Sequence, residues 1–352
     1  NLGRLRLVRT GDNAAPIKAS DLHRPKQHLD LWTGTLESHF ELDGEPVSVV
    51  TCAHPDQDTV ALRIESRLIA LHRIAVELAF PYPDLKEFGG YGNWTLPDAH
   101  KTVLTQTEPG RASLARTVDA DAYTVSLAWK DNATLSAMTE KHRFILAAGT
   151  SNCLEFACNF APAPPDRSLP AFTATLAASS LYWQAFWNQG GAVDFSGSTD
   201  PRANELERRI ILSQYLTAVN CAGSLPPQES GLVNNGWNGK FHMEMYWWHG
   251  AHYALWDRWP LLSRSIGVYR RFLPSAREKA ARQGYRGARW PKCTGPEGRE
   301  SPHPIHAMLI WQQPHPIFLA ELDFRAHPGR NTLNAWADIV MDTADFMASF
   351  AV

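Results

Sequence analysis

The pattern of apolar residues changes once along the chain, at a run of prolines. Ala161 to Pro165 reads APAPP, and successive prolines interrupt helices and are excluded from central strands. Before this run, from about residue 28 to 160, apolar and polar residues alternate with a period of two, which is typical of antiparallel strands. From about residue 200 onward, apolar residues recur at helical spacing. The pattern predicts an α+β chain, with a β half followed by a helical half, and not a series of βαβ units.

Local signals within each half give the expected elements. Alternation punctuated by Asp43-Gly44 and by prolines predicts an antiparallel β-sandwich, with strands at residues 40–42, 47–51, 60–64, 71–79, 123–129, 143–147 and 154–159. Residues 80–97 are rich in Gly, Pro and aromatic side chains and are expected to form a long loop, of the kind that is often functional. Helices are predicted at residues 202–222, 250–258, 260–272, 275–284, 303–326 and 331–350. Pro314 and Pro316 should kink or split the helix within 303–326.

Composition excludes several classes of function. The 34 Lys and Arg against 36 Asp and Glu leave no surplus of positive charge for nucleic acid. No apolar run reaches the roughly 18 residues that a membrane-spanning helix needs. The five cysteines form no CxxC pair, and the sequence has no phosphate-binding glycine loop, so we expect neither a metal nor a cofactor. Thirteen tryptophans among few charges favour stacking on flat, weakly charged ligands, and sugars are the obvious class.

The first residues say little about cellular location. The sequence begins at Asn1, and residues 1–10 lack the apolar run of a signal peptide. We expect that the start has been processed or that the sequence lies within a longer protein. The location is unknown, with a periplasmic or secreted protein favoured over a cytoplasmic one.

Residues 231–260 are the densest in polar and aromatic side chains. Asn and Gly residues at 234–239 favour a loop, which then enters a helix. Trp237 offers a stacking face and Glu244 can accept hydroxyl hydrogen bonds, so we expect both to contact a sugar ring. The remaining tryptophans of this stretch are expected in the core: Trp247, Trp248, Trp256 and Trp259.

A second loop, residues 284–304, carries several charged side chains among four glycines and four prolines. It is suited to the rim of a pocket, whereas an ordinary solvated connection is the alternative that we slightly favour on this pattern alone. Five histidines near the two loops match no zinc-binding spacing and are expected to be core or hydrogen-bonding residues: His242, His249, His252, His303 and His306.

Taken together, the two loops resemble those of glycoside hydrolase family 65 and its clan of six-hairpin α/α-barrel enzymes. The family has G-H-I-F-W-D-T-E in the first loop, where residues 239–244 read GKFHME. It has G-A-x-F-P-W-E-S and a following G-x-E in the second, where residues 287–294 read GARWPKCT and 295–300 read GPEGRE. Residues 27–36, QHLDLWTGTL, are similar to the opening of the family's N-terminal sandwich. The resemblance thus covers nearly the whole chain.

The resemblance implies both an architecture and a set of site residues. Residues 1–160 would form the β-sandwich, 161–200 a Pro-rich linker and helical connection, and 201–352 the first part of an α/α-barrel catalytic domain. Substrate-binding residues would be Trp237, Asn238, Lys240, Glu244, Arg289, Trp290, Lys292, Glu297 and Glu300. Where the family has Trp-Asp this chain has Met243-Glu244, and where it has Trp-Glu this chain has Lys292-Cys293. The first carboxylate is therefore kept as Glu and the second is absent.

The resemblance also implies the reaction. The clan inverts the anomeric centre, with one carboxylic acid protonating the leaving oxygen while water or phosphate attacks from the opposite face. The family's general acid follows the helix that ends here at Val352, so we expect the catalytic acid and half of the barrel beyond it. We expect a glycoside hydrolase acting on an α-linked oligosaccharide, ahead of a disaccharide phosphorylase. A polysaccharide lyase is disfavoured by its reversed domain order, and a non-catalytic glycan-binding protein and a homodimer remain open.

Overall fold

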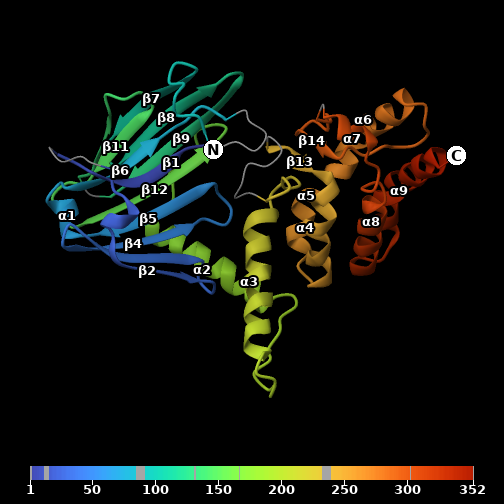
Figure 1. The fold of residues 1–352 in the computed structure, drawn as a ribbon, viewed down its shortest axis with the longest axis horizontal. Coiled ribbons are helices and arrows are strands. Elements are labelled where there is room, and N and C mark those ends of the chain that lie inside the picture. The colour runs from blue at the N-terminus through green and yellow to red at the C-terminus, as the bar shows by residue number, and fades with distance from the viewer. Residues whose placement is uncertain are drawn as a thin grey trace. The chain divides into compact units, whose positions relative to one another are not determined.

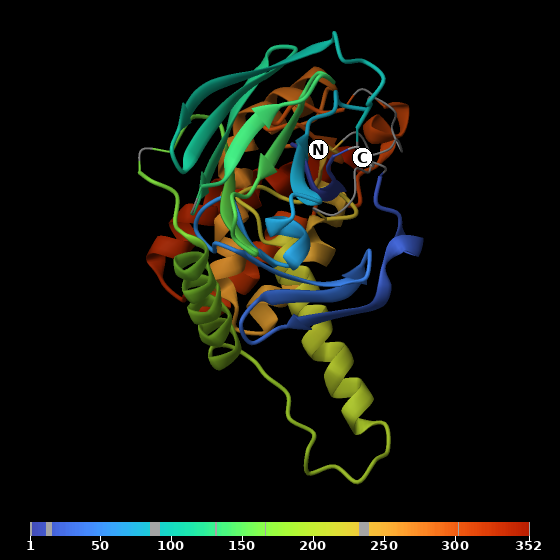
Figure 2. The same ribbon diagram turned by 90° about the vertical axis from the view of Figure 1, so that its left-hand side faces the viewer.

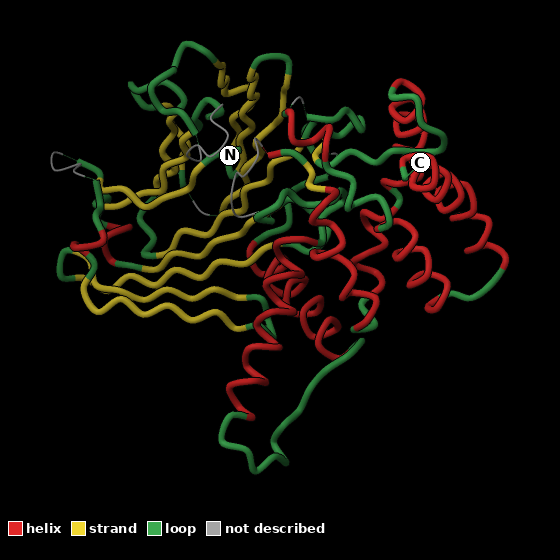
Figure 3. Tube along the Cα trace, turned by 45° about the vertical axis from the view of Figure 1, so that its right-hand side comes forward, coloured by secondary structure: helices red, strands yellow, loops and turns green. Residues whose placement is uncertain are grey.

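The computed structural model describes residues 2–11, 16–84, 92–130, 132–165, 167–231, 239–301 and 303–351. The chain divides into two compact units (Figure 1). Unit 1 comprises Asn1–Asp84 and Tyr91–Asn188, and unit 2 comprises Leu85–Gly90 and Gln189–Val352. The domain boundaries at residues 160 and 200 stay predictions. Strands dominate the first part of the chain and helices the second (Figure 3).

Unit 1 contains two antiparallel sheets (Figure 2). One has the order β1-β6-β11-β10 and the other the order β2-β3-β4-β5-β12-β9-β8-β7. The strands are β1 (Arg4–Arg9), β2 (His23–Asp30), β3 (Thr35–Leu42), β4 (Glu45–Ala53), β5 (Thr59–Glu65), β6 (Ile74–Ala79), β7 (His100–Glu108), β8 (Arg111–Val118), β9 (Asp121–Trp129), β10 (Thr134–Ala137), β11 (Arg143–Ala147) and β12 (Cys153–Ala161). Three helical segments accompany them: η1 (Ala19–Asp21), α1 (Arg67–Ala70) and α2 (Phe172–Asn188).

The two sheets share one apolar core, as the predicted sandwich requires. Val76 and Leu78 of β6 pack in the same buried cluster as Ile64 of β5 and Leu114 of β8. The Asp43-Gly44 turn joins β3 to β4 with both residues at positive φ, the two-residue geometry that suits a hairpin. The core thus draws on alternate residues of both sheets.

The strand predictions are confirmed for β4, β5, β9, β11 and β12 and incomplete elsewhere. The segment 71–79 is a strand only from Ile74 because Ser66, whose hydroxyl accepts a hydrogen bond from the amide of Leu68, starts the short helix α1. Five strands were not predicted from the sequence: β1, β2, β7, β8 and β10. In β8 the polar residue Arg116 occupies a buried, inward position, which obscures the alternation.

Helix α2 covers part of one face of the larger sheet. Phe172 packs with Cys52, Ala61 and Ala157, which lie on β4, β5 and β12. At its other end the indole of Trp187 donates a 2.6 Å hydrogen bond to the carbonyl of Leu31.

Unit 2 is helical apart from two very short strands. Its elements are α3 (Ala203–Cys221), β13 (Phe241–His242), α4 (Met243–Leu255), α5 (Trp259–Ile266), α6 (Val268–Arg282), β14 (Cys293–Thr294), α7 (Pro304–Met308), α8 (His315–Ala326) and α9 (Arg330–Phe350). The predicted helices at 202–222 and 331–350 are confirmed, and the 303–326 segment is split before Pro314 as expected. None of the helices in the described ranges is long and apolar enough to cross a membrane.

Three local predictions in unit 2 are wrong. Helix α4 begins at Met243, so Glu244 lies in a helical first turn and not in a loop. Pro274 lies inside α6, which stays continuous because Phe272, Leu273 and Ala276 on its buried face pack into the core and offset the missing hydrogen bond. Trp248 is 57% exposed, whereas Trp290 and Trp336 fill the core. Trp247, Trp256 and Trp259 are only partly buried.

Candidate functional site

The two loops that resemble the glycosidase family meet in unit 2 through a small antiparallel ladder. In it Phe241 of β13 pairs with Thr294 of β14, and His242 pairs with Cys293. The amide of Glu244 also donates a 3.3 Å hydrogen bond to the carbonyl of Lys292. The ladder therefore brings the first turn of α4 against the segment before β14.

A buried ion pair lies at this junction. Lys292 Nζ is 2.8 Å from Glu244 Oε2, and the two side chains are 4% and 14% exposed. Lys292 Nζ also lies 3.2 Å from His242 Nε2. An ammonium group only donates, so His242 Nε2 acts as the acceptor and the imidazole proton is on Nδ1. The ion pair engages Oε2 of the Glu244 carboxylate.

Burial keeps the neighbouring histidines neutral. It lowers the pKa of His242 to about 3, with further contributions from Lys292, His306 and His249. Burial likewise lowers the pKa of His306, whose Nδ1 lies 3.1 Å from the Ser301 carbonyl, and that of His249. Neutral imidazoles around an ion pair offer hydrogen bonds with no surplus charge, which suits an uncharged polyhydroxylated ligand. Within the described ranges, no group of three or more His, Cys, Asp or Glu side chains could hold a metal ion.

The other residues singled out in the sequence lie in different surroundings. Trp290 is completely buried, its indole donates to Thr343 Oγ1 at 2.8 Å, and its ring has no face open to a sugar. Arg289 is 3% exposed and donates to Gln283 Oε1. Glu300 pairs with Lys279, Glu297 is exposed, and Lys240 is partly buried. Trp237 and Asn238 lie outside the described residues.

The second loop is therefore neither a rim nor a solvated connection along its middle. Residues 288–294 are buried throughout, and Cys293, whose pKa burial raises to about 12, is an inert thiol. The prediction that His242 and His306 are core or hydrogen-bonding residues is confirmed, because both are buried and both have polar partners. Their part in this network had no signal of its own because their partners lie up to fifty residues away.

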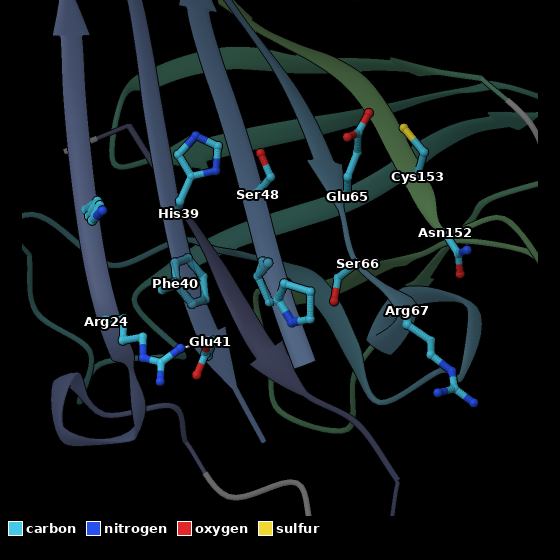
Figure 4. A pocket seen from close by; sticks show the side chains of 13 residues that line it. Arg24, His39, Phe40, Glu41, Ser48, Glu65, Ser66, Arg67, Asn152 and Cys153 are labelled. Atoms are coloured by element: carbon cyan, nitrogen blue, oxygen red, sulfur yellow. Dashed lines mark hydrogen bonds and ion pairs between the residues drawn. The ribbon is translucent and has the colours of Figure 1, made fainter. Parts of the chain in front are cut away.

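A second feature is an open groove of about 720 Å³ on the larger sheet in unit 1, on the face that α2 partly covers (Figure 4). His39, Ser48, Glu65 and Cys153 lie side by side on β3, β4, β5 and β12, each opposite the next in the strand register. Arg24 and Glu41 at one side form a 3.0 Å ion pair. The groove offers a row of donors and acceptors across four strands.

Comparisons with known proteins give a match in structure but none in sequence. No protein-family model and no curated protein sequence matches the chain. A protein from the human microbiome assigned as a kojibiose phosphorylase matches with a TM-score of 0.65 at 13% identity, over 98% of this chain and 49% of its own. A bacterial glucoamylase in complex with acarbose matches with a TM-score of 0.59 at 11% identity, over 98% of this chain and 52% of its own.

The chain shares the fold of these two proteins. It spans about half of their length and corresponds to the first half of six-hairpin glycosidase structures. The α+β fold class, with antiparallel sheets before helices, is confirmed, and so is the resemblance to this group of carbohydrate-active enzymes at the level of the fold.

Neutral histidines at the site make the stability of the protein depend on pH. The unfolded chain protonates His242 near its ordinary pKa of 6.5, whereas the folded chain does so only near 3. The unfolded state therefore binds more protons between these values, so the free energy of unfolding should fall as pH drops through this window, by up to about 1.4 kcal/mol per pH unit for each such histidine. His249, His306 and His315 act in the same direction.

The check is the urea midpoint, followed by tryptophan fluorescence, between pH 7.5 and pH 5. His242→Gln should flatten the profile because it removes one of the titrating groups. A midpoint that stays constant in the wild-type chain over this range would show that these histidines are not held neutral.

Proposed function

We propose that the protein to which this chain belongs cleaves a glycosidic bond with inversion and acts as a glycoside hydrolase on an α-linked oligosaccharide. The observation that carries the proposal is the structural match over 98% of the chain to a protein assigned as a phosphorylase of kojibiose and to a glucoamylase that binds acarbose. The uncharged character of the histidine network agrees with a sugar ligand. Phosphorolysis is the alternative within the same fold.

In this proposal Glu244 binds the substrate and does not transfer the proton. Oε2 is engaged by Lys292, and Oε1 accepts a hydrogen bond from a sugar hydroxyl. The proton donor is a carboxylic acid expected on the C-terminal side of Val352, and water attacks the opposite face of the sugar ring. Lys240, Asn238 and Trp237 complete the expected binding loop.

The test uses the full-length gene product. It is incubated with kojibiose, maltose and trehalose, with and without inorganic phosphate, and the sugars released are quantified by chromatography. Release of free glucose without phosphate is the expected result. Cleavage only with phosphate, with formation of a sugar phosphate, would make the enzyme a phosphorylase, and no cleavage of any linkage would contradict the proposal.

A non-catalytic glycan-binding role is the second candidate, and the groove of Figure 4 is the observation that favours it. Ser48→Trp should fill this groove without disturbing the core, because Ser48 lines the open groove. If glycans bind in the groove, this variant loses binding and the double variant Glu244→Gln with Lys292→Met, which removes both charges of the buried pair, does not. If instead the change at the Glu244 site abolishes glycan binding and Ser48→Trp does not, binding is assigned to the Glu244 site.

A further inference from the structure

Unit 1 buries a cation on the inner face of its larger sheet. Along β8 the residues that face the core alternate as Ala112, Leu114, Arg116 and Val118, and Arg116 is only 1% exposed. Its strand register places it opposite Thr102 of β7 and Tyr123 of β9. An arginine therefore occupies a position that the alternation reserves for an apolar side chain.

Every acceptor around Arg116 is electrically neutral. Its Nε donates to the Tyr123 hydroxyl at 3.2 Å and its Nη2 to the Pro81 carbonyl at 3.2 Å. Its Nη1 donates to His100 Nδ1 at 2.8 Å, to Thr102 Oγ1 at 2.5 Å and to the Lys101 carbonyl at 3.2 Å. Across the described residues, no carboxylate lies within ion-pair distance of this guanidinium.

Another buried charge in the same unit is compensated. Glu77, also 1% exposed, pairs with Arg6 and with Arg143, the latter at 3.1 Å, and lies 3.9 Å from Arg4. A buried ion is costly unless an opposite charge accompanies it. Arg116 therefore stands out as a fixed positive charge whose counter-ion is not supplied by the described chain.

A cavity of about 520 Å³ is lined by His100, Lys101 and Thr102, three of the residues that accept hydrogen bonds from Arg116. It is lined by residues 97–98 and 100–104 before and within β7, and by residues 137–144 at the turn from β10 to β11. The rings of His100 and His142 stack there with their centroids 3.8 Å apart. Lys101 lines the cavity and is exposed, Asp98 is paired with Lys141, and Glu140 is exposed.

The hydrogen bonds fix which nitrogens carry protons. Arg116 only donates, so His100 Nδ1 accepts and the proton lies on Nε2, leaving an N–H for a ligand in the cavity. His142 Nε2 donates to the Pro97 carbonyl at 2.6 Å, so its Nδ1 accepts from the Thr102 hydroxyl at 2.8 Å. Burial, His142 and Arg116 lower the pKa of His100 to about 4, so this arrangement holds at neutral pH.

We propose that this cavity binds an oxyanion, which accepts a hydrogen bond from His100 Nε2–H, pairs with Lys101, and balances the buried charge of Arg116. The chemistry fits a carboxylate or a phosphate group, whose sources are an acidic sugar or free phosphate. The site lies entirely within unit 1 and does not depend on the glycosidase proposal.

Calorimetric titration of the 352-residue chain with inorganic phosphate, glucuronate and glucose, at low ionic strength, tests the proposal. Saturable binding of phosphate, glucuronate or both is expected, and no binding of glucose. Phosphate alone identifies free phosphate as the source, and glucuronate alone identifies an acidic sugar. If neither anion binds, the proposal is overturned.

Two lysines provide a matched pair of variants that leave the core intact. Lys101→Met removes the cation at the cavity, on edge strand β7, and should weaken anion binding at least tenfold because charge-assisted hydrogen bonds are lost. Lys18→Met removes an exposed lysine of unit 1 that lines neither this cavity nor the groove of Figure 4, and should leave affinity within twofold. Equal affinities in the two variants would show that anions bind by general surface charge and would refute the site.

Discussion

Glu244→Gln should lower the free energy of unfolding by about 3–5 kcal/mol, because the change strands a buried ammonium group. Lys292 is 4% exposed and its Nζ lies 2.8 Å from the Glu244 carboxylate, so the amide would leave that charge without its counter-ion. The measurement is a urea unfolding curve followed by tryptophan fluorescence.

Two controls distinguish the effect of breaking this buried ion pair from the effect of removing a carboxylate elsewhere. Glu244→Gln combined with Lys292→Met removes both charges and should recover much of the lost stability, giving a clear coupling in a double-mutant cycle. Glu205→Gln breaks the exposed pairs with Arg208 and Arg209 and should leave the urea midpoint nearly unchanged, because solvent screens exposed ion pairs. If Glu244→Gln were as stable as the parent, the buried pair would be disproved and Glu244 would be free to serve as a pure substrate ligand.

Gly287→Ala should cost more than about 3 kcal/mol or prevent folding, because two independent penalties fall on the same residue. A Cβ at this position would lie 2.0 Å from the Asp342 carbonyl oxygen and 2.6 Å from the Phe346 amide nitrogen, both in the backbone of α9. Gly287 also has a φ of +68°, where side chains are strained. The neighbouring amide of Ala288 donates to the same Asp342 carbonyl at 2.9 Å, so the loop cannot move away without losing this bond.

Gly284 provides the matched control in the same loop. Its φ is +82°, but a Cβ there would meet nothing within 4 Å. Gly284→Ala therefore measures backbone strain alone, about 1–2 kcal/mol. Equal melting temperatures for the two alanine variants would show that close approach to α9 does not restrict residue 287.

The order of strands before helices could be predicted from the sequence, because burial of one face of an element gives its apolar residues a regular spacing. In β11 buried and partly buried residues alternate along the strand, and the APAPP run marks where the period of two ends. Strand β8 was not predicted because Arg116 occupies an inward position. The sequence pattern does not indicate the neutral acceptors that surround this side chain. The sequence predicted two helices on either side of Pro274, but α6 is continuous. Its tertiary packing, which the local sequence does not encode, outweighs one missing hydrogen bond.

Only part of the candidate site could be predicted from the sequence. Resemblance to a family joined the Glu244 and Lys292 loops across the chain, and the structure brings these two residues into contact. The resemblance did not distinguish substrate contacts from core residues, because Trp290 and Arg289 share the motif and yet lie buried on Thr343 and Gln283. Whether a loop residue is buried depends on which face of the loop packs against α9. The spacing of residues in the sequence does not indicate that face.

Proton NMR of the sugar first released from an α-linked disaccharide by the full-length gene product tests the account most directly. Inversion predicts that the β-anomer of glucose appears first and then mutarotates to the equilibrium mixture. Initial release of the α-anomer, which requires a retaining mechanism with a covalent intermediate, would contradict the account.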